Sequence, residues 1–197
     1  VTVLVNYQRR YLPVYQALRD RFLAGAVGEC RQIQLNYSRG LETNGSHILD
    51  TLFFVVGDQA EYRLQWVSHD EDFTNPSFVM AIDGFSVMVT GMALPYHNID
   101  ILITGDEGRL SVLHGGMTSV VERKIEHELF PGFYRLQVQE DPLSALAGLF
   151  GGMENALQDL LDAHETGRLP VSNLGATRKT MALIEELRFW QTSGRIR

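Results

Sequence analysis

The segment GLETNGSHILD, residues 40–50, carries the side chains whose types and spacing best suit acid–base chemistry. His47 and Asp50 are three positions apart, so on a helix they would lie one turn apart on the same face. A carboxylate in that position can orient an imidazole and raise its basicity, as general acid–base catalysis requires. A helix N-terminus disfavours the charged imidazole, and the two opposing effects together predict a pKa near neutrality.

The same residues also admit a purely structural interpretation. His47 can hydrogen-bond at the end of the helix while Asp50 stabilises its first turn. Asn44 or Ser46 can act as the N-cap, and Gly45 lets the backbone turn tightly beneath it. The segment taken alone leaves both interpretations open.

No other pattern in the sequence is typical of a catalytic or metal site. The remaining histidines have no second ligand at a dependable spacing, so we expect no metal (His69, His97, His114, His127 and His164). The acidic HDED, residues 69–72, is expected to be a solvated loop. Cys30 is the only cysteine, which excludes an internal disulfide, fits a cytoplasmic location and favours a small core residue over a nucleophile. The chain contains neither G-x-x-x-x-G-K-S/T nor G-x-G-x-x-G after a strand.

Composition excludes two classes of partner. The net charge of −7 argues against a surface for nucleic acid or for an anionic membrane, since both require a basic patch. No apolar run approaches the roughly 20 residues of a membrane span. With 45% hydrophobic and 21% charged residues, the 197-residue chain has the composition of a globular protein with a sizeable core.

The elements that must position these side chains follow from hydrophobic periodicity. Helical spacing predicts helices over residues 14–26, from the opening segment to Val56 with an end at Gly57, over 146–166, and after a cap at Asn173. Strands are predicted at 1–7, 30–38, 62–68, 78–83, 85–93, 99–105, 109–115, 119–126 and 134–139, with turns at 83–84 and 105–108. The fold class is therefore α+β: a large, open, mostly antiparallel sheet covered by helices on one face.

The strands FVMAI and FSVMV carry apolar residues at both alternating sets of positions. The outer face of the sheet is therefore not expected to be fully solvated, and we expect a homo-oligomer formed through it.

Several motifs in order resemble one known family. VNYQRRYLPVYQALRDRFLAGAVGE, QLNYSRG, NGSHILDTLFFVVGD and LDAHETGRLPVSNLGATRKTMALIEELRFWQTSGR are similar to the C-terminal half of the Gfo/Idh/MocA family, which includes glucose-fructose oxidoreductase and inositol dehydrogenase. The resemblance covers essentially the whole chain. It implies residues 9–197 are a substrate-binding and oligomerisation domain, and residues 1–8 a remnant of the last strand of a missing N-terminal Rossmann domain.

The resemblance also implies chemistry. The intact protein would be an NAD(P)-dependent dehydrogenase that uses NAD or NADP on a sugar, polyol or nucleotide-sugar, while this fragment would bind no cofactor and be inactive alone. His47 matches the histidine of the family's D-x-x-x-H motif, and Asp50 an acidic residue that often follows it. Tyr7, Arg9 and Arg10 match a segment near the cofactor.

One position departs from the family pattern. Thr43 stands where many members have Asp, which puts a two-residue proton relay in doubt and leaves a non-catalytic binding or scaffold module as the alternative function. The expected substrate-binding residues are Thr43, Asn44 and Asp50, together with Tyr37 and Arg39, which could equally be a packed aromatic ring and a solvated charge.

Overall fold

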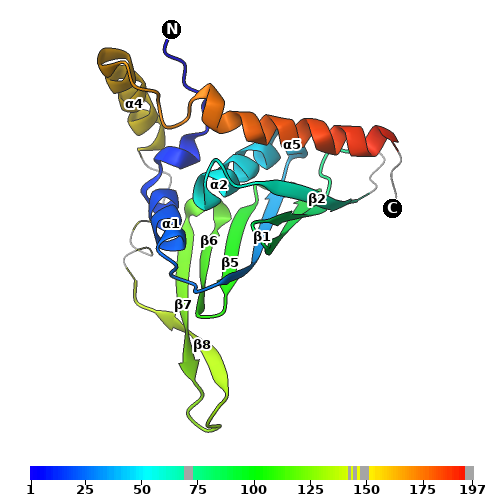
Figure 1. Ribbon diagram of the computed structural model, residues 1–197, viewed down its shortest axis with the longest axis vertical. Coiled ribbons are helices and arrows are strands. Elements are labelled where there is room, and N and C mark those ends of the chain that lie inside the picture. Colours follow the sequence, from blue (N-terminus) through cyan, green and yellow to red (C-terminus); the bar gives the residue numbers. More distant parts are fainter. Residues whose placement is uncertain (69–72, 142, 144–145, 147–150, 194–197) are drawn as a thin grey trace.

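An open eight-stranded sheet organises the computed structural model, which describes residues 1–68, 73–141, 143, 146 and 151–193 (Figure 1). The strand order is β2-β3-β4-β1-β5-β6-β7-β8, in which β1 and β4 are parallel and all other neighbours are antiparallel. The strands are β1 (Cys30–Ser38), β2 (Tyr62–Val67), β3 (Phe78–Ile82), β4 (Phe85–Met92), β5 (Ile99–Gly105), β6 (Gly108–Leu113), β7 (Thr118–Glu126) and β8 (Tyr134–Gln139). The predicted α+β fold class is confirmed.

The helices lie on one face of this sheet (Figure 1). They are α1 (Pro13–Leu23), α2 (Ser46–Val56), α4 (Gly152–Thr166) and α5 (Leu174–Ser193), with short helical turns η1 (Gln8–Tyr11), η2 (Gly40–Gly45) and η3 (His114–Gly116). α1 and α2 pack together above the sheet, and α5 crosses α2. The strand predicted over residues 109–115 ends earlier, at Leu113, because His114 and Gly115 belong to η3.

Alternation along β1 shows why the sheet has one buried face. Ile33, Leu35 and Tyr37 are fully buried beneath the helices, whereas Gln32 and Gln34 point to the other face. The register continues this division, because Leu35 pairs with Val89 and with Ile101, both buried. The predicted strand 30–38 is confirmed.

Two predicted local signals are also confirmed. Asp83 and Gly84 form a two-residue hairpin turn with φ values of 44° and 95°, the left-handed conformation that such turns require. Asn173 caps α5, because its side-chain oxygen accepts a hydrogen bond from the amide of Ala176 at 3.1 Å. On α5 itself Ile184 and Leu187 are buried.

The strand predicted over residues 1–7 is wrong. The segment lies against the connection between α4 and α5, without a strand partner among the described residues, and a 2.8 Å hydrogen bond joins the Val5 amide to the Ser172 carbonyl. Val1 and Val3 are exposed. A β-branched run forms a strand only where a neighbouring strand supplies its hydrogen bonds.

The helix predicted from Leu146 begins later than expected. Leu146 lies in a turn and α4 starts at Gly152, while residues 147–150 of the predicted helix fall outside the described residues, as does HDED at 69–72. The apolar stripe of α4 is exposed, with Met153 at 54%, Leu157 at 58% and Leu161 at 48%. α4 packs against η1 instead of the sheet.

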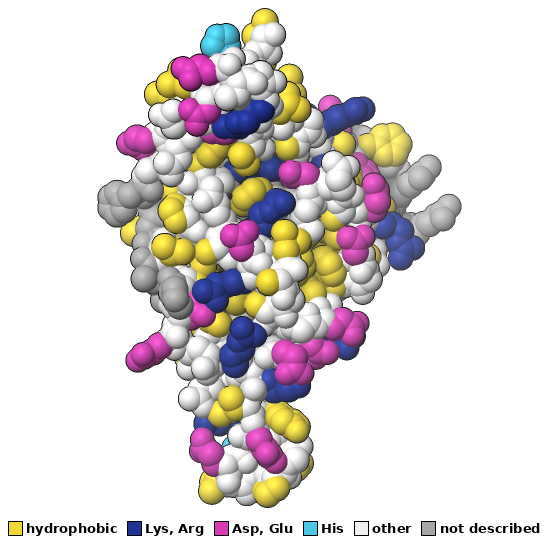
Figure 2. All heavy atoms as spheres, turned by 60° about the vertical axis from the view of Figure 1, so that its left-hand side comes forward, with side chains coloured by type: hydrophobic (Ala, Val, Ile, Leu, Met, Phe, Trp, Pro, Cys, Tyr) yellow, Lys and Arg dark blue, Asp and Glu magenta, His cyan; other side chains and the backbone are white. Residues whose placement is uncertain are grey.

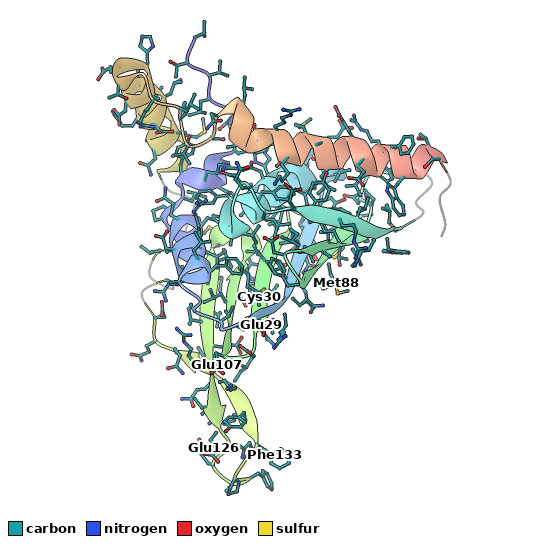
Figure 3. The ribbon with its side chains drawn as sticks, in the orientation of Figure 1. Glu29, Cys30, Met88, Glu107, Glu126 and Phe133 are labelled. Carbon is teal, nitrogen blue, oxygen red and sulfur yellow. The ribbon has the colours of Figure 1, made fainter. Side chains whose placement is uncertain are left out.

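The β7–β8 hairpin extends well beyond the helices (Figure 1). Its tip carries exposed apolar side chains, among them Leu129, Phe130 and Phe133. Figure 3 shows Phe133 and Glu126 at this far end, and Figure 2 shows hydrophobic side chains there.

Candidate functional site

His47 lies further inside a helical segment than its sequence position suggests. The π-helical turn η2 runs directly into α2, so His47 does not follow a free helix end. The amides at the true start are satisfied from another segment: the Gly40 amide donates to the Asn75 side-chain oxygen and the Leu41 amide to the Thr74 carbonyl, both at 2.8 Å. We expected a free helix N-terminus to disfavour the charged form of His47, but His47 does not lie at such an end.

The expected capping residues have other partners. The Ser46 hydroxyl donates to the carbonyls of Glu42 and Thr43 at 2.9 and 2.7 Å, and no side chain caps α2. Gly45 has an ordinary helical φ of −59°, so it is not needed for a tight turn. A Cβ there would lie 3.1 Å from the Tyr37 ring and from Leu41, so a larger residue would require these two side chains to shift.

The imidazole of His47 is half-buried against the edge of the Tyr7 ring, with ring centroids 5.2 Å apart. Its Nδ1 is enclosed without a hydrogen-bond partner, which leaves Nε2 to exchange a proton with a ligand. Burial, together with the charge of Arg9 and the proximity of His97, lowers the pKa of His47 to about 4. The prediction of a pKa near neutrality is therefore wrong, and the ring is neutral at pH 7.

Asp50 does not orient His47. Both its oxygens accept hydrogen bonds from Arg10 at 2.8 Å, and the two side chains are completely buried. Arg10 also binds Asp58 at 2.9 Å. Burial by itself lowers the pKa of Arg10, but the hydrogen bonds and charges of the two carboxylates raise it above its ordinary value. Burial raises the pKa of Asp50 to about 6 against the effect of Arg10, so the pair is ionised at pH 7.

A second histidine, His97, which the sequence analysis did not place at the site, joins it. The Asn44 amide nitrogen lies 3.1 Å from His97 Nδ1. Antiparallel pairing of β1 with β5 brings the two segments together, and Ser38 fixes the junction by donating to the Tyr96 carbonyl and accepting from the Asn98 amide. His97 could have been assigned to the site only from this strand pairing, and no pattern in the sequence specified that pairing.

Arg9 is buried close to His97, beside Gly115. It is 6% exposed, and burial, Arg9 and Arg39 lower the pKa of His97. Together, Arg9, Asn44, His47 and His97 form what we call the His47 site, bordered by Tyr7.

The remaining expected contacts lie elsewhere. Tyr37 is fully buried and donates to the Pro76 carbonyl at 2.8 Å, which fits the packed-aromatic alternative. Arg39 and Thr43 border a separate cavity of about 280 Å³ whose other lining residues are Gly40, Leu41, Glu42, Phe73, Thr74 and Arg188. The Thr43 hydroxyl donates to the carbonyls of Arg39 and Gly40, so it makes no relay to His47.

The described part of the chain offers little support for a metal site or a reactive thiol. Its residues contain no group of three or more His, Cys, Asp or Glu side chains that could hold a metal ion. Cys30 lies at the opposite end of β1 from the His47 site (Figure 3), and burial raises the pKa of its thiol to about 11, which makes it unreactive. Among the helices described, none is long and apolar enough to cross a bilayer.

A nicotinamide cofactor fits this chain only in part. The unpartnered Nε of Arg9 and the half-buried face of His47 suit a polar group brought by a ligand. The sequence has no glycine-rich phosphate loop, so the described residues could contact one end of such a cofactor and not cradle its phosphates.

Comparison with known proteins gives matches only among solved structures. No protein-family model and no curated protein matches the chain. An inositol dehydrogenase homolog from Azotobacter vinelandii, solved with NADH and myo-inositol, superposes with a TM-score of 0.74 at 17% identity, over 98% of this chain and 62% of that one. An oxidoreductase domain protein from Kribbella flavida gives 0.72 at 18% identity, over 99% and 66%.

A UDP-N-acetylglucosamine 3-dehydrogenase from Acidithiobacillus ferrooxidans gives a TM-score of 0.69 at 17% identity, over 95% of this chain and 62% of that one. The chain thus spans less than two thirds of the length of these proteins. The predicted resemblance is confirmed at the level of the fold, and we conclude that this chain has the fold of the C-terminal part of the Gfo/Idh/MocA oxidoreductases.

Proposed function

We propose that this chain is the substrate-binding domain of an NAD(P)-dependent oxidoreductase that acts on a hydroxyl or carbonyl group of a sugar, polyol or nucleotide-sugar. The observation that carries the proposal is His47: a neutral, half-buried imidazole with one enclosed nitrogen, beside Asn44 and His97, in a fold known from such oxidoreductases.

His47 moves the proton in this mechanism. Bound NAD(P) supplies the hydride acceptor or donor. Because the ring is neutral at pH 7, its Nε2 can accept the proton of a substrate hydroxyl during oxidation and return it during reduction. A pKa of about 4 makes it a weak base by itself, so a bound ligand that raises this pKa would improve catalysis.

Asn44 and His97 orient the substrate in this proposal. The Asn44 side-chain oxygen is free to accept a bond from a sugar hydroxyl, since its nitrogen faces His97. Asp50 and Arg10 act as positioning residues, because their buried ion pair fixes α2 against η1. Arg10 therefore has a structural role in this proposal, and its expected contact with the cofactor stays a prediction.

A nucleotide-binding domain would dock on the exposed stripe of α4. Met153, Leu157 and Leu161 form this apolar face, and Leu169 and Leu174 extend it toward the extended segment 1–7. Hydrophobic side chains are visible at this upper end of the molecule in Figure 2. An apolar surface of this kind typically marks an interaction site.

A second copy of the chain would cover the outer face of the sheet. The strand register aligns Trp66, Val79, Met88, Gln34 and Leu102 in one row across this face. Trp66 is 52% and Met88 40% exposed. Burying such a mixed apolar row stabilises a homodimer.

The test measures NAD(P)-dependent turnover of the full gene product on a panel of polyols, sugars and nucleotide-sugars. We expect His47→Ala to lower kcat by about 10²–10⁴-fold, the usual contribution of a general base. His127→Ala, in the β7–β8 turn at the far end of the molecule from α4 (Figure 1), is the matched control. An unchanged rate in the His47 variant would remove His47 from the mechanism.

The second candidate function is a binding or scaffold module without dehydrogenase activity. It is favoured by Thr43, whose hydroxyl bonds to backbone carbonyls in place of a relay to His47. Absence of turnover on every substrate of the panel, with binding retained, would support it.

A further inference from the structure

Arg9 and Arg10 are adjacent, buried arginines with very different surroundings. Arg10 is 0% exposed and contacts two carboxylates, those of Asp50 and Asp58. Arg9 is 6% exposed, and no carboxylate of the described residues forms an ion pair with it. Its Nε has no hydrogen-bond partner. The two neighbours therefore differ in whether a carboxylate pairs directly with the guanidinium.

The nearby carboxylates are already occupied. Asp50 gives both oxygens to Arg10. Asp100 accepts the backbone amide of His114 at 2.8 Å with one oxygen and the side-chain amide of Asn98 at 3.2 Å with the other. A buried guanidinium without a counter-charge is costly, because desolvation is not offset by an ion pair. Since no carboxylate of the described residues contacts Arg9 directly, its N–H donors remain available to an anionic group of a ligand.

The Arg9 guanidinium lies close to Gly115 and His97. A Cβ on Gly115 would lie 3.1 Å from His97 Nε2 and 4.0 Å from Arg9 Nη2, so these two groups converge on a backbone that lacks a side chain. Gly115 has a φ of 70°, which glycine tolerates best. The charge of Arg9 also lowers the pKa of both His47 and His97.

We propose that Arg9 receives an oxyanionic group, a carboxylate or a phosphate, of the ligand that binds at the His47 site. The inference rests on the proposed function and narrows its substrate class to acidic or phosphorylated sugar-like compounds, unless the oxyanion comes from the cofactor. A guanidinium binds both groups through two parallel N–H donors. The bound anion would also offset the field of Arg9 at His47 and make its imidazole a stronger base.

The experiment follows the imidazole resonances of His47 and His97 by NMR in the 197-residue chain, during separate titrations with sodium D-glucuronate, D-glucose 6-phosphate, NADH and D-glucose. Glucuronate and glucose differ only in the group at C6. We expect at least about tenfold tighter binding of the anionic compound than of glucose, as befits a charge-assisted bidentate contact. Arg9→Gln should abolish this preference and Arg9→Lys should retain part of it. Arg63→Gln, an exposed arginine on β2, removes the same charge and should change nothing.

The outcomes separate the sources of the anion. A response to the two acidic sugars assigns Arg9 to the substrate, and a response to NADH alone assigns it to the cofactor. Equal affinity for glucose and glucuronate in the wild type would overturn the inference while leaving the proposed function intact. This comparison uses only the wild-type protein, so it does not depend on whether a variant folds. Unperturbed resonances with all four compounds would also overturn it, and turnover by the full gene product would then still test the function.

Discussion

Asp50 gives both carboxylate oxygens to Arg10, at 2.8 Å each, and none to His47, although His47 stands only one helical turn away. Asp50 and His47 therefore have different roles, although they belong to the same helix. Asp50 anchors α2 through a fully buried ion pair, while His47 keeps an unpaired imidazole at the surface where a ligand would bind.

Replacing Asp50 by Asn should strongly destabilise the fold. The change leaves the completely buried Arg10 with a single carboxylate, so we expect the free energy of unfolding to fall by about 3–5 kcal/mol. Asp58→Asn removes the partly exposed partner of the same arginine, and there a loss of about 1 kcal/mol is expected. Urea unfolding of the two variants measures both values. Equal losses would show that the pair with Asp50 is not the anchor.

His47 should make stability depend on pH in acid solution. Its pKa is lowered to about 4 in the folded protein, against about 6.5 in the unfolded chain, so the unfolded state takes up the proton first. The contribution of neutral His47 is therefore complete above about pH 6.5 and is lost as the pH falls toward 4, by at most on the order of 3 kcal/mol. The measurement compares unfolding free energies of wild type and His47→Gln at several pH values.

The difference between these two proteins isolates His47 from other groups that titrate in the same range, Asp50 among them. His164→Gln on α4 provides the control for a solvent-exposed imidazole. A constant difference between wild type and His47→Gln from pH 7 to pH 4 would contradict the prediction.

Met88→Lys should weaken self-association without unfolding the chain. Met88 is 40% exposed on the outer face of the sheet (Figure 3), and a lysine there would place a charge in the proposed dimer interface. Sedimentation should show a dimer for the wild type and the monomer of 22.2 kDa for the variant. A wild type that sediments only as the monomer at micromolar concentration would contradict the proposed interface.

Leu157→Lys tests the other proposed interface, the one between α4 and the nucleotide-binding domain. Leu157 is 58% exposed on α4, so the substitution should change the melting temperature of the isolated chain little. It should instead weaken docking of the nucleotide-binding domain, measured as faster proteolysis between the two parts of the full gene product. Met88→Lys serves as its control in that assay, and identical proteolysis of both variants would exclude α4 as the docking face.

Gly45→Ala should destabilise the chain although alanine favours helices. Its Cβ would approach the Tyr37 ring and Leu41 to 3.1 Å, and both neighbours are buried. We expect a loss of about 1–3 kcal/mol, as for other overpacked cores. Thermal unfolding checks this, and a gain in stability would show that the neighbours can move aside.

Much of the fold followed from local patterns. Alternation in CRQIQLNYS, the Asp83–Gly84 turn and the Asn173 cap each predicted an element that the structure confirms, because each depends on residues close in sequence. The strand predicted over residues 1–7 and the helix start predicted at Leu146 are wrong for the opposite reason. A β-branched segment and an amphipathic helix find their burial only where a partner surface lies against them.

The candidate site, like the fold, could be predicted from the sequence only in part. Residue types and order in the sequence identified His47 as the candidate for acid–base chemistry and the family that its surroundings resemble. Only the tertiary structure decided that Asp50 binds Arg10, that His97 joins Asn44, and that Arg9 is buried and lowers the pKa of both imidazoles. Arg10 and Asp50 are 40 positions apart, and Asn44 and His97 are 53 positions apart. Strand pairing and helix packing, which no local pattern encodes, bring such residues together.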